Sequence, residues 1–329
     1  MLNAKLLTFS ILFNFILIFY YKQISDFIGI YDYPRGERKI HKKPIPLYGG
    51  IIIFFNLLIF FLYNFYSDTS FNFINLNIFF LFLTVIFLIG LADDYREQGY
   101  LYKFFSLSLA IFFLIFIDNN LLLSEIYFET FSFKINFSFF SYFISILCFL
   151  LFINASNMFD GTNLQYSLYS FIVILIFFFK SNQLIFIYIL IALLFFMFLN
   201  FNGKIFLGES GVLILSFIIS FFSIKFFKSN LISVEEIFLI MYFPGLDMFR
   251  LFFHRLVNKK NPFKGDKNHF HHILNNFFSE KISVLLIIFL SFLFYFIYQY
   301  YRSNIIILLS IISYFLFYVL LIFTLKMDR

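Results

Sequence analysis

Long, unbroken hydrophobic runs separated by short polar segments are the main pattern along the chain. A helix that spans a membrane needs about 20 mostly apolar residues. Eleven segments fit this requirement, or ten if one of the shorter runs is set aside. A transmembrane β-barrel would instead alternate apolar and polar residues. The pattern therefore predicts an all-α polytopic membrane protein with 10–11 transmembrane helices. The candidate spans lie near residues 4–22, 47–66, 74–92, 103–117, 139–155, 164–180, 184–199, 211–227, 234–252, 282–299 and 304–325.

The loops between these segments alternate between two kinds. Loops 23–46 and 253–281 are rich in Lys and Arg, whereas the loops on the other side carry few basic residues. Basic residues concentrate in cytoplasmic loops, so the N-terminus is expected outside and the C-terminus inside. Segment 124–138 alternates polar and apolar residues, which predicts a small β-hairpin on the outer side. No repeat of fixed period divides the chain, and residues 1–329 are expected to form a single membrane domain.

Composition agrees with a membrane protein. The chain is 62% hydrophobic and 13% charged, whereas a soluble domain is about half apolar and a quarter charged. The net charge of +6 falls mostly in particular loops and does not indicate nucleic-acid binding. The single cysteine, Cys148, lies in an apolar run and is predicted to be a core residue. No small-residue cleavage site follows the first apolar run, residues 6–21, which predicts a retained helix rather than a signal peptide.

Two motifs place carboxylates and amides at the predicted cytoplasmic ends of spans. Asp93 and Asp94 end the third span; such a pair can bind a divalent cation or accept a proton, or simply mark a solvated helix end. Asn154, Asn157 and Asp160 recur every three residues, which would place them on one face of a helical turn. Oxygens that face one way suit Mg²⁺ or the polar groups of a nucleotide, with an ordinary polar loop as the alternative.

A third motif, Gly208-Glu209-Ser210-Gly211, begins the eighth span. Free backbone N–H groups at a helix N-terminus favour phosphate. A carboxylate at that place would repel phosphate unless a cation lay between them. Glu209 is therefore either a partner of the helix dipole or a metal ligand beside a phosphate.

Basic residues form two further motifs on the same side. No cysteine accompanies the histidines of the loop after the ninth span, so contacts with phosphates are at least as reasonable there as zinc binding, and a generic basic loop is the alternative. The polar residues of that loop include Arg255, Asp266, His269, His271 and His272.

The second basic motif precedes the second span. Lys42 and Lys43 add positive charge there, which topology alone can explain. Gly49 and Gly50 follow and permit either tight packing or a ligand approach.

Asp247 and Arg250 lie late in the ninth span. They are expected to be structural, either as a pair or by holding the loop that follows.

The motifs together favour one chemistry. Oxygen ligands for Mg²⁺ and cations for phosphates on one face of a membrane are what phosphoryl transfer requires. The membrane setting indicates that one substrate is a lipid.

At this point the sequence resembles a known family. DDYRE, NxxNxxDG, FxG[DE]xG and PFxxDxxHxHHxL, in this order over roughly residues 30–275, resemble the polyprenyl-phosphate N-acetylhexosamine-1-phosphate transferases. The HxHH loop and IPLYGG are more similar to the undecaprenyl-phosphate GlcNAc-1-phosphate transferase branch, which starts O-antigen, enterobacterial common antigen or teichoic-acid chains. They are less similar to the phospho-MurNAc-pentapeptide translocase of peptidoglycan synthesis, which stays the alternative.

The resemblance implies an activity and a location. A UDP-N-acetylhexosamine, such as UDP-GlcNAc, would give its sugar 1-phosphate to undecaprenyl phosphate and release UMP, with Mg²⁺ as cofactor and Mn²⁺ as a substitute. It implies a multi-pass protein of the bacterial inner membrane with its active site on the cytoplasmic side. It also implies a role in cell wall biogenesis, such as lipopolysaccharide O-antigen biosynthesis, and is compatible with a homodimer.

The resemblance also implies roles for individual residues. It implies that Asn157 and Glu209 bind the metal ion. It also implies that Asp93 and Asp94 lie near the attacking lipid phosphate. The residues with an implied catalytic role are Asp93, Asp94, Asp160, His269, His271 and His272. The residues with implied substrate contacts are Lys42, Asn154, Asp160 and Arg255.

The chain departs from the family pattern at two places. Glu209 stands where Asp is usual, and Asn163–Leu164 stands where a second Asp–Gly pair is common. A function from another class, a transporter of lipid-linked or nucleotide sugars, would need polar residues near the middle of the membrane. The polar motifs here cluster on one side, which favours the transferase.

Overall fold

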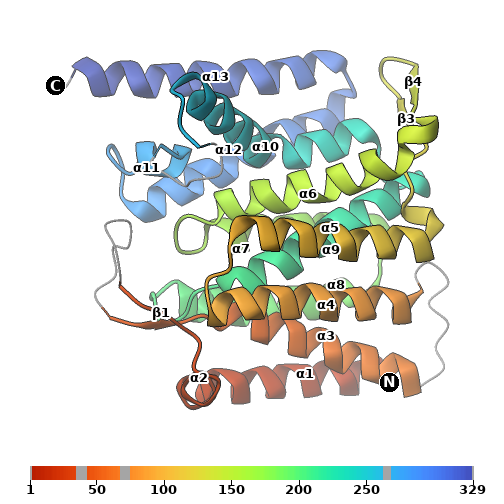
Figure 1. The fold of residues 1–329 in the computed structure, drawn as a ribbon, viewed down its shortest axis with the longest axis vertical. Coiled ribbons are helices and arrows are strands. Elements are labelled where there is room, and N and C mark those ends of the chain that lie inside the picture. Colours follow the sequence, from red (N-terminus) through yellow and green to blue (C-terminus); the bar gives the residue numbers. More distant parts are fainter. Residues whose placement is uncertain (1, 35–42, 67–74, 262–267, 328–329) are drawn as a thin grey trace. The chain divides into compact units, whose positions relative to one another are not determined.

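The computed structural model describes residues 2–34, 43–66, 75–261 and 268–327, and helices dominate it (Figure 1). The helices are α1 (Leu2–Phe19), α2 (Tyr21–Ile28), α3 (Gly49–Tyr66), α4 (Leu76–Tyr95), α5 (Tyr100–Ile117), α6 (Ser141–Phe159), α7 (Gln165–Ser181), α8 (Leu184–Asn200), α9 (Gly208–Lys228), α10 (Val234–Val257), α11 (Phe270–Leu274), α12 (Glu280–Tyr301) and α13 (Asn304–Met327). The strands are β1 (Tyr31–Asp32), β2 (Ile45–Pro46), β3 (Glu125–Phe128) and β4 (Phe133–Asn136), with 3-10 turns η1 (Asn119–Leu121) and η2 (Ser138–Phe140).

The predicted class, an all-α polytopic membrane protein, is confirmed, because each of the eleven predicted segments is helical. Among the described residues, eight helices are long and apolar enough to cross a membrane. A ninth is added if α1 and α2, which meet at a 68° bend, count as one span. The two remaining segments, α7 and α8, have 17 residues each. At 1.5 Å per residue they rise about 26 Å, short of a hydrocarbon core about 30 Å thick.

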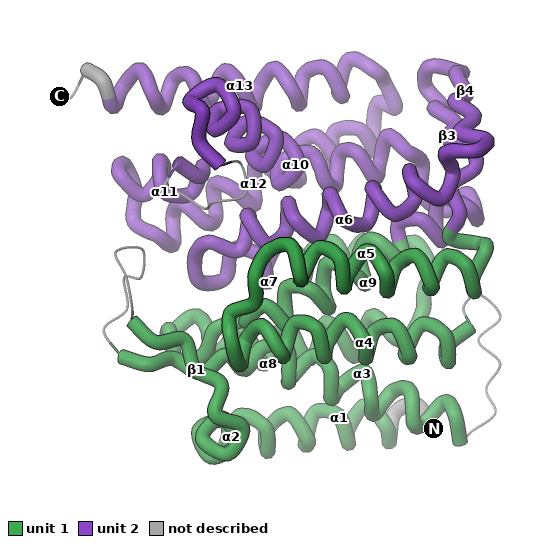
Figure 2. The backbone as a smooth tube through the Cα atoms, in the orientation of Figure 1, with its two compact units in different colours: residues 1–121, 170–222 green, residues 122–169, 223–329 purple. Residues whose placement is uncertain are grey.

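The chain forms two compact units (Figure 2). Unit 1 consists of residues 1–121 and 170–222, and unit 2 of residues 122–169 and 223–329. Each unit therefore combines two separate stretches of the chain.

Aromatic side chains and a buried amide pair hold unit 1 together. α3 packs against α1, α4 and α8, and α4 packs against α5. The rings of Phe54 and Phe87 stack with centroids 4.2 Å apart. The side chains of Asn14 and Asn56 are buried and exchange two hydrogen bonds of 2.7 and 3.0 Å between α1 and α3. Small polar side chains that satisfy each other in this way are common between membrane helices.

Unit 2 is built around α10. This helix packs against α6, α12 and α13. Strands β3 and β4 pair antiparallel with Glu125 opposite Asn136, which confirms the predicted hairpin. The hairpin is tied to the start of α10, because the backbone N–H of Thr130 donates to Glu235 at 2.9 Å.

One prediction of burial was wrong. Cys148 is exposed on the surface of α6 rather than part of the core. An apolar residue of a membrane helix can face lipid as readily as protein, because both surroundings are apolar. An apolar run therefore does not reveal which of its residues pack inside.

Candidate active site

The first glycines of α3 lie against the segment that precedes α9, both within unit 1. Leu47 forms a parallel bridge with Phe206. The backbone N–H of Gly49 donates to the carbonyl oxygen of Phe206 at 3.0 Å, and that of Gly50 donates to Leu207 at 3.1 Å. These bonds satisfy N–H groups that have no partner inside a helix. They also bring the IPLYGG and FLGESG motifs together.

The structure shows that Gly50 permits tight helix packing, which is one of the two roles predicted for it, the other being the approach of a ligand. A Cβ atom at this position would lie 2.3 Å from Oγ of Ser210 and 2.6 Å from the backbone nitrogen of Gly211. Only glycine permits the start of α3 to approach the start of α9 this closely.

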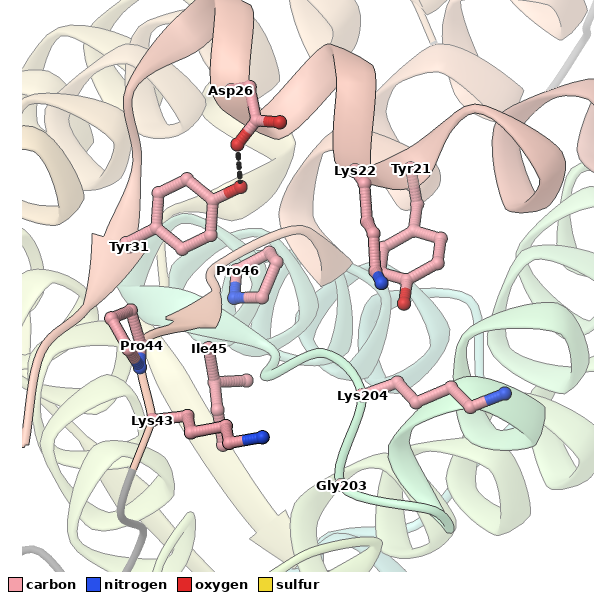
Figure 3. Close-up of a pocket in the computed structure, with 10 residues that line it drawn as sticks. All are labelled: Tyr21, Lys22, Asp26, Tyr31, Lys43, Pro44, Ile45, Pro46, Gly203 and Lys204. Atoms are coloured by element: carbon pink, nitrogen blue, oxygen red, sulfur yellow. Dashed lines mark hydrogen bonds between the residues drawn. The ribbon is translucent and has the colours of Figure 1, made fainter.

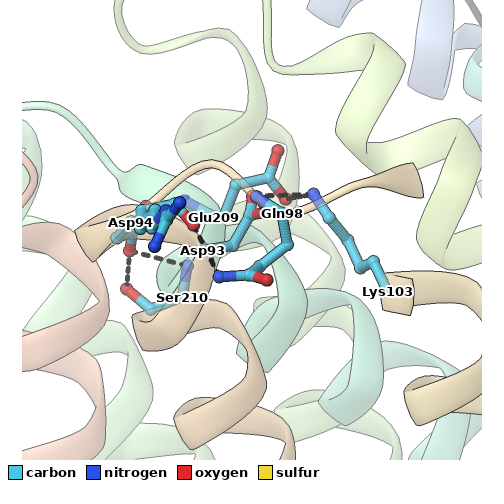
Figure 4. Close-up of polar contacts among 7 residues, drawn as sticks. Asp93, Asp94, Gln98, Lys103, Glu209 and Ser210 are labelled. Atoms are coloured by element: carbon cyan, nitrogen blue, oxygen red, sulfur yellow. Dashed lines mark hydrogen bonds and ion pairs between the residues drawn. The ribbon is translucent and has the colours of Figure 1, made fainter. Parts of the chain in front are cut away.

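Asp94 caps the N-terminus of α9 (Figure 4). Its Oδ1 accepts a 2.7 Å hydrogen bond from the backbone N–H of Glu209. Its Oδ2 accepts from the backbone N–H of Ser210 at 3.0 Å and from the Ser210 hydroxyl at 2.5 Å. The anion at this helix end, where the sequence favours phosphate, is therefore a carboxylate of α4. Asp94 fixes the first turn of α9 and with it the position of Glu209.

Lys103 of α5 lies between two carboxylates (Figure 4). Its ammonium nitrogen is 2.8 Å from Oδ2 of Asp93 and 3.0 Å from Oε2 of Glu209. The other oxygen of Asp93 accepts a 2.7 Å hydrogen bond from the backbone N–H of Gln98. We call Asp93, Asp94, Lys103, Glu209 and Ser210 the carboxylate cluster.

The carboxylate cluster contains oxygen ligands of the kind that a hard divalent cation takes, with the Lys103 ammonium group between them. The carboxylates of Asp93 and Glu209 converge on one ammonium group, which leaves one negative charge on the three side chains. Among the described residues, no three His, Cys, Asp or Glu side chains come together as metal ligands. Mg²⁺ is commonly held by only one or two carboxylates and completes its coordination with water and substrate phosphates. Of the predicted metal ligands, Glu209 belongs to unit 1 and Asn157 to unit 2.

A basic pocket of about 480 Å³ also lies in unit 1 (Figure 3). Lys22, Lys43 and Lys204 line it from three separate segments. Asp26 accepts a hydrogen bond from the hydroxyl of Tyr31. Burial and this bond to Asp26 raise the pKa of Tyr31 to about 12, so the hydroxyl stays protonated. Three ammonium groups around such a space suit a phosphate ester. The predicted substrate residue Lys42 lies just outside the described residues.

In unit 2, the NxxNxxDG motif spans the end of α6. Asn154 and Asn157 lie on neighbouring turns of the helix, and Asn154 donates to the carbonyl oxygen of Leu150 at 2.8 Å. The helix ends at Phe159, and Asp160 has non-helical backbone angles. Asp160 is the C-cap residue, and its backbone N–H still donates to the carbonyl oxygen of Ser156 at 2.9 Å, so it keeps the helical spacing to Asn154 and Asn157 before the chain turns.

The histidine motif folds as a short helix. His269 precedes α11, and His271 and His272 lie within it. This short helix lies within the predicted connection 253–281 between two spans. α10 also extends to Val257, so that the buried Arg255 belongs to its last turn.

His271 packs against the glycine that ends the NxxNxxDG motif. A Cβ atom on Gly161 would lie 2.0 Å from Cε1 of His271, so no other residue fits there without displacing the ring. Burial, with His272 and His269 nearby, lowers the pKa of His271 to about 3. A neutral ring at neutral pH can donate or accept a hydrogen bond but carries no positive charge. Any cationic contact with phosphate would then belong to the neighbouring histidines.

The structure brings some predicted residues together and leaves others apart. Asp93, Asp94 and Glu209 share the carboxylate cluster. The three histidines lie together in unit 2, where the His271 and His272 rings have centroids 4.2 Å apart. The sequence analysis missed Lys103 and the side-chain role of Ser210. A lysine inside an apolar run is a signal for a functional position, and Lys103 met that description.

The fold and these clusters show what class of protein this is: a polytopic helical membrane protein with acidic and basic side chains at the ends of its helices. Residues 76–227 match glycosyl transferase family 4. The chain is similar to undecaprenyl-phosphate α-N-acetylglucosaminyl 1-phosphate transferase of Thermotoga maritima, with 30% identity over 262 residues, 78% of this chain and 77% of the relative. The chain belongs to glycosyl transferase family 4.

Two further relatives agree. A probable undecaprenyl-phosphate N-acetylglucosaminyl 1-phosphate transferase of Bacillus subtilis is 27% identical over 286 residues, 83% of this chain and 77% of the relative. The corresponding α-N-acetylglucosaminyl enzyme of Escherichia coli K12 is 24% identical over 292 residues, 84% of this chain and 77% of the relative. The predicted family and the prediction of a membrane phosphotransferase are confirmed. The roles of individual residues stay predictions.

Proposed function

We propose that this protein transfers an N-acetylhexosamine 1-phosphate from a UDP-sugar to undecaprenyl phosphate. The names of the relatives support the acceptor and the sugar class. The single observation that carries the proposal within the structure is the position of Lys103 between Asp93 and Glu209, at 2.8 and 3.0 Å. Phosphoryl transfer needs carboxylates that can hold a metal ion and cations that can reach the phosphates, and this cluster supplies both kinds of residue.

The reaction balances without an additional reactant. An oxygen of undecaprenyl phosphate attacks the phosphorus that carries the sugar, and a new P–O bond forms. The bond from that phosphorus to the oxygen bridging it to the uridine phosphate breaks. UMP leaves with the bridging oxygen, and the sugar stays on a lipid diphosphate.

The carboxylate cluster provides positioning and charge. Asp94 holds the first turn of α9 through three hydrogen bonds. Glu209 is thereby held beside Lys103, whose ammonium group can contact a phosphate oxygen while it pairs with a carboxylate. Asp93 lies beside Lys103 and can accept a proton from the acceptor phosphate.

Mg²⁺ is the proposed cofactor, with Mn²⁺ as a substitute. The family resemblance implies Glu209 and Asn157 as its ligands. When bound, it would neutralise charge on the diphosphate. The chain's own contribution is to fix the oxygen ligands through the Asp94 cap and Lys103.

The polar residues of unit 2 are proposed to bind the donor. Asn154 and Asp160 would contact the nucleotide, whereas Arg255 and the histidines would contact phosphates. The family resemblance implies a substrate contact for Lys42 of unit 1 as well. Burial holds His271 neutral, so that ring could contact a phosphate only through a hydrogen bond.

The proposed setting is the inner membrane of a bacterium, with the active site at the cytoplasmic surface. The product would be the first lipid-linked sugar of a cell-surface polysaccharide such as O-antigen. A homodimer is also proposed, on the family resemblance alone.

A labelled-donor assay tests the function. Membranes that contain the protein, supplied with undecaprenyl phosphate and Mg²⁺, are expected to convert labelled UDP-GlcNAc or a related UDP-N-acetylhexosamine into a lipid product with equal release of UMP. A panel of donors that includes UDP-MurNAc-pentapeptide separates this enzyme from the translocase. Uptake of intact donor into sealed vesicles without UMP release would indicate a transporter. No lipid product with any donor in the panel would overturn the proposal.

A matched pair of variants links the activity to the site. Lys103→Met removes the ammonium group but keeps an unbranched side chain of similar length, and it is expected to reduce UMP release by roughly 100-fold. Lys134→Met removes an exposed lysine that pairs with Glu125 in the hairpin and is expected to leave the rate unchanged.

A further inference from the structure

A buried polar cluster lies next to the histidine helix in unit 2. Asp247 and Arg250 of α10 are 4% and 9% exposed, and His269 is 8% exposed. The guanidinium Nη2 of Arg250 is 2.6 Å from Oδ1 of Asp247, so the predicted pair is present. A buried charge persists only when it is paired and hydrogen-bonded. The contacts below show that this cluster reaches beyond the pair.

The two oxygens of Asp247 have different partners. Oδ1 accepts from Arg250 at 2.6 Å and from the hydroxyl of Tyr314 in α13 at 2.9 Å. Oδ2 faces Nδ1 of His269 at 3.6 Å. Within the described part of the chain, that nitrogen is buried and makes no hydrogen bond. Oδ1 of Asp247 is therefore bound by side chains of α10 and α13. Oδ2 faces Nδ1 of His269, which has no hydrogen-bond acceptor at closer range in the described ranges of the chain.

Arg250 fixes the backbone next to the same histidine. Its Nη2 donates to the carbonyl oxygen of Asn268 at 2.9 Å, and its Nε donates to Tyr314 at 3.1 Å. The guanidinium also lies 4.3 Å from the centre of the Tyr318 ring. α10 and α13 thus hold the residue before His269 in place, while Asp247 faces the ring.

This geometry leaves Nε2 of the His269 ring as the nitrogen that can contact the substrate, because Nδ1 faces Asp247. A carboxylate beside Nδ1 favours the proton on that nitrogen, and the partner of one ring nitrogen decides the state of the other. Among the described residues, the nearby groups are Arg250, Tyr314, His271 and His272, and none of these four offers a second carboxylate to the ring. A gap of 3.6 Å is longer than a hydrogen bond, but such contacts are often long before substrate binds and shorten afterwards.

We propose that Asp247 is a positioning residue for His269: it orients the ring, holds the proton on Nδ1 and leaves Nε2 unprotonated, so that Nε2 can accept a hydrogen bond or a proton from a phosphate hydroxyl of the substrate. The inference rests on the proposed function, in which His269 contacts phosphate. Asp247 does not touch substrate and acts only through the histidine. Arg250 holds its carboxylate in the required orientation through the 2.6 Å contact with Oδ1.

A magnetic-resonance measurement tests the proposal without turnover. In protein with ¹⁵N-labelled histidine, assigned with a His269→Gln variant, the ring shifts of His269 are expected to show the proton on Nδ1 at alkaline pH. Asp247→Asn is expected to convert this into a mixture of both tautomers. A wild-type ring with its proton on Nε2 would overturn the proposal, and this result needs no variant to fold.

Kinetics provide the second test. Asp247→Asn is expected to lower kcat by roughly 10- to 100-fold with a much smaller change in KM. The double variant Asp247→Asn/His269→Gln is expected to be no slower than His269→Gln alone, because Asp247 acts through that ring. Additive losses, or a normal kcat in folded Asp247→Asn, would show a merely structural role.

Tyr314→Phe is the matched control. It removes a buried hydrogen bond to the same carboxylate but leaves Oδ2 facing His269, so it is expected to lower the thermal midpoint while the His269 tautomer stays unchanged. If tautomers behave as expected but the wild-type protein makes no lipid product, the proposed function fails and the Asp247–His269 arrangement stands. If lipid product forms while the tautomer does not depend on Asp247, only this inference fails.

Discussion

At the scale of single residues, the charge of Glu209 is the feature most directly open to test. Its carboxylate lies 3.0 Å from Lys103, in a helix turn capped by Asp94. Glu209→Gln keeps the shape but removes the charge, and it is expected to reduce Mg²⁺-dependent UMP release by roughly 100-fold. Glu209→Asp keeps the charge on a shorter chain and is expected to retain part of the rate.

The control is Glu97→Gln, which removes an exposed acid near the end of α4 and should leave the rate unchanged. If Glu209→Gln turns over normally, Glu209 serves only the dipole of α9. The measurement is the initial rate of UMP release at several Mg²⁺ concentrations, because a lost ligand shifts the Mg²⁺ dependence as well as the rate.

A second residue-scale prediction concerns Leu164, which stands where the family pattern that the sequence resembles has glycine. Its backbone angle φ is +67°, in the left-handed region that costs a residue with a Cβ atom about 1–2 kcal/mol. Leu164→Gly and Leu164→Ala remove the same packing, but only alanine keeps the Cβ atom. The glycine variant is therefore expected to be more stable than the alanine variant by about 1 kcal/mol. Thermal unfolding in detergent measures the difference, and equal midpoints would show that the turn carries no strain.

At the scale of elements, the sequence predicted the long helices well, because a backbone in a membrane can adopt few structures. A backbone inside a membrane must satisfy its own hydrogen bonds, so a long apolar run is a helix. The elements it missed are short and polar. α11 has five residues in a charged segment, and α2 follows the 68° bend after α1. Such pieces are stabilised by tertiary contacts, as His271 is by Gly161, and not by a repeating apolar pattern.

The β3–β4 hairpin provides an element-scale prediction. Glu235 accepts from both the backbone N–H and the hydroxyl of Thr130, at 2.9 and 2.8 Å. Glu235→Ala leaves these donors without a partner, at a cost of about 1–3 kcal/mol. Faster amide hydrogen exchange is expected over residues 125–136, with the rest of unit 2 unchanged.

Glu125→Gln supplies the comparison for the hairpin. It removes a partly exposed ion pair with Lys134 in the same element, and exposed pairs contribute about 0–1 kcal/mol. Exchange that rises equally in both variants would mean that Glu235 does not anchor the hairpin.

At the scale of the whole molecule, the sequence indicated which residue types bind phosphate and Mg²⁺, but not which of these residues contact one another. The carboxylates, amides and histidines were recognisable because their residue types and spacings suit phosphate and Mg²⁺. That Lys103 lies between Asp93 and Glu209 was not predictable, because these residues are brought together by the packing of α4, α5 and α9. The cap formed by Asp94 on α9 was hidden for the same reason. Contacts between segments far apart in sequence leave no local pattern.

The stability of the whole protein is expected to depend on pH through His271. Burial lowers its pKa in the folded protein to about 3, whereas an unfolded histidine titrates near 6.5. The unfolded state therefore binds the proton more readily between these values. The contribution of His271 to stability is complete above about pH 6.5 and is lost as the pH falls toward 3, by at most about 1.4 kcal/mol for each pH unit.

The difference between two proteins isolates this contribution, since carboxylates also titrate in acid. Unfolding midpoints of wild type and His271→Gln, measured from pH 7.5 down to 4.5, are expected to converge as the pH falls, because only wild type has a buried imidazole to protonate. His254→Gln is the control, because that ring is exposed near the end of α10 and its removal should leave the slope with pH unchanged. Parallel curves for wild type and His271→Gln would show that protonation of His271 does not destabilise the folded protein. The description of His271 as a neutral ring packed against Gly161 would then be wrong.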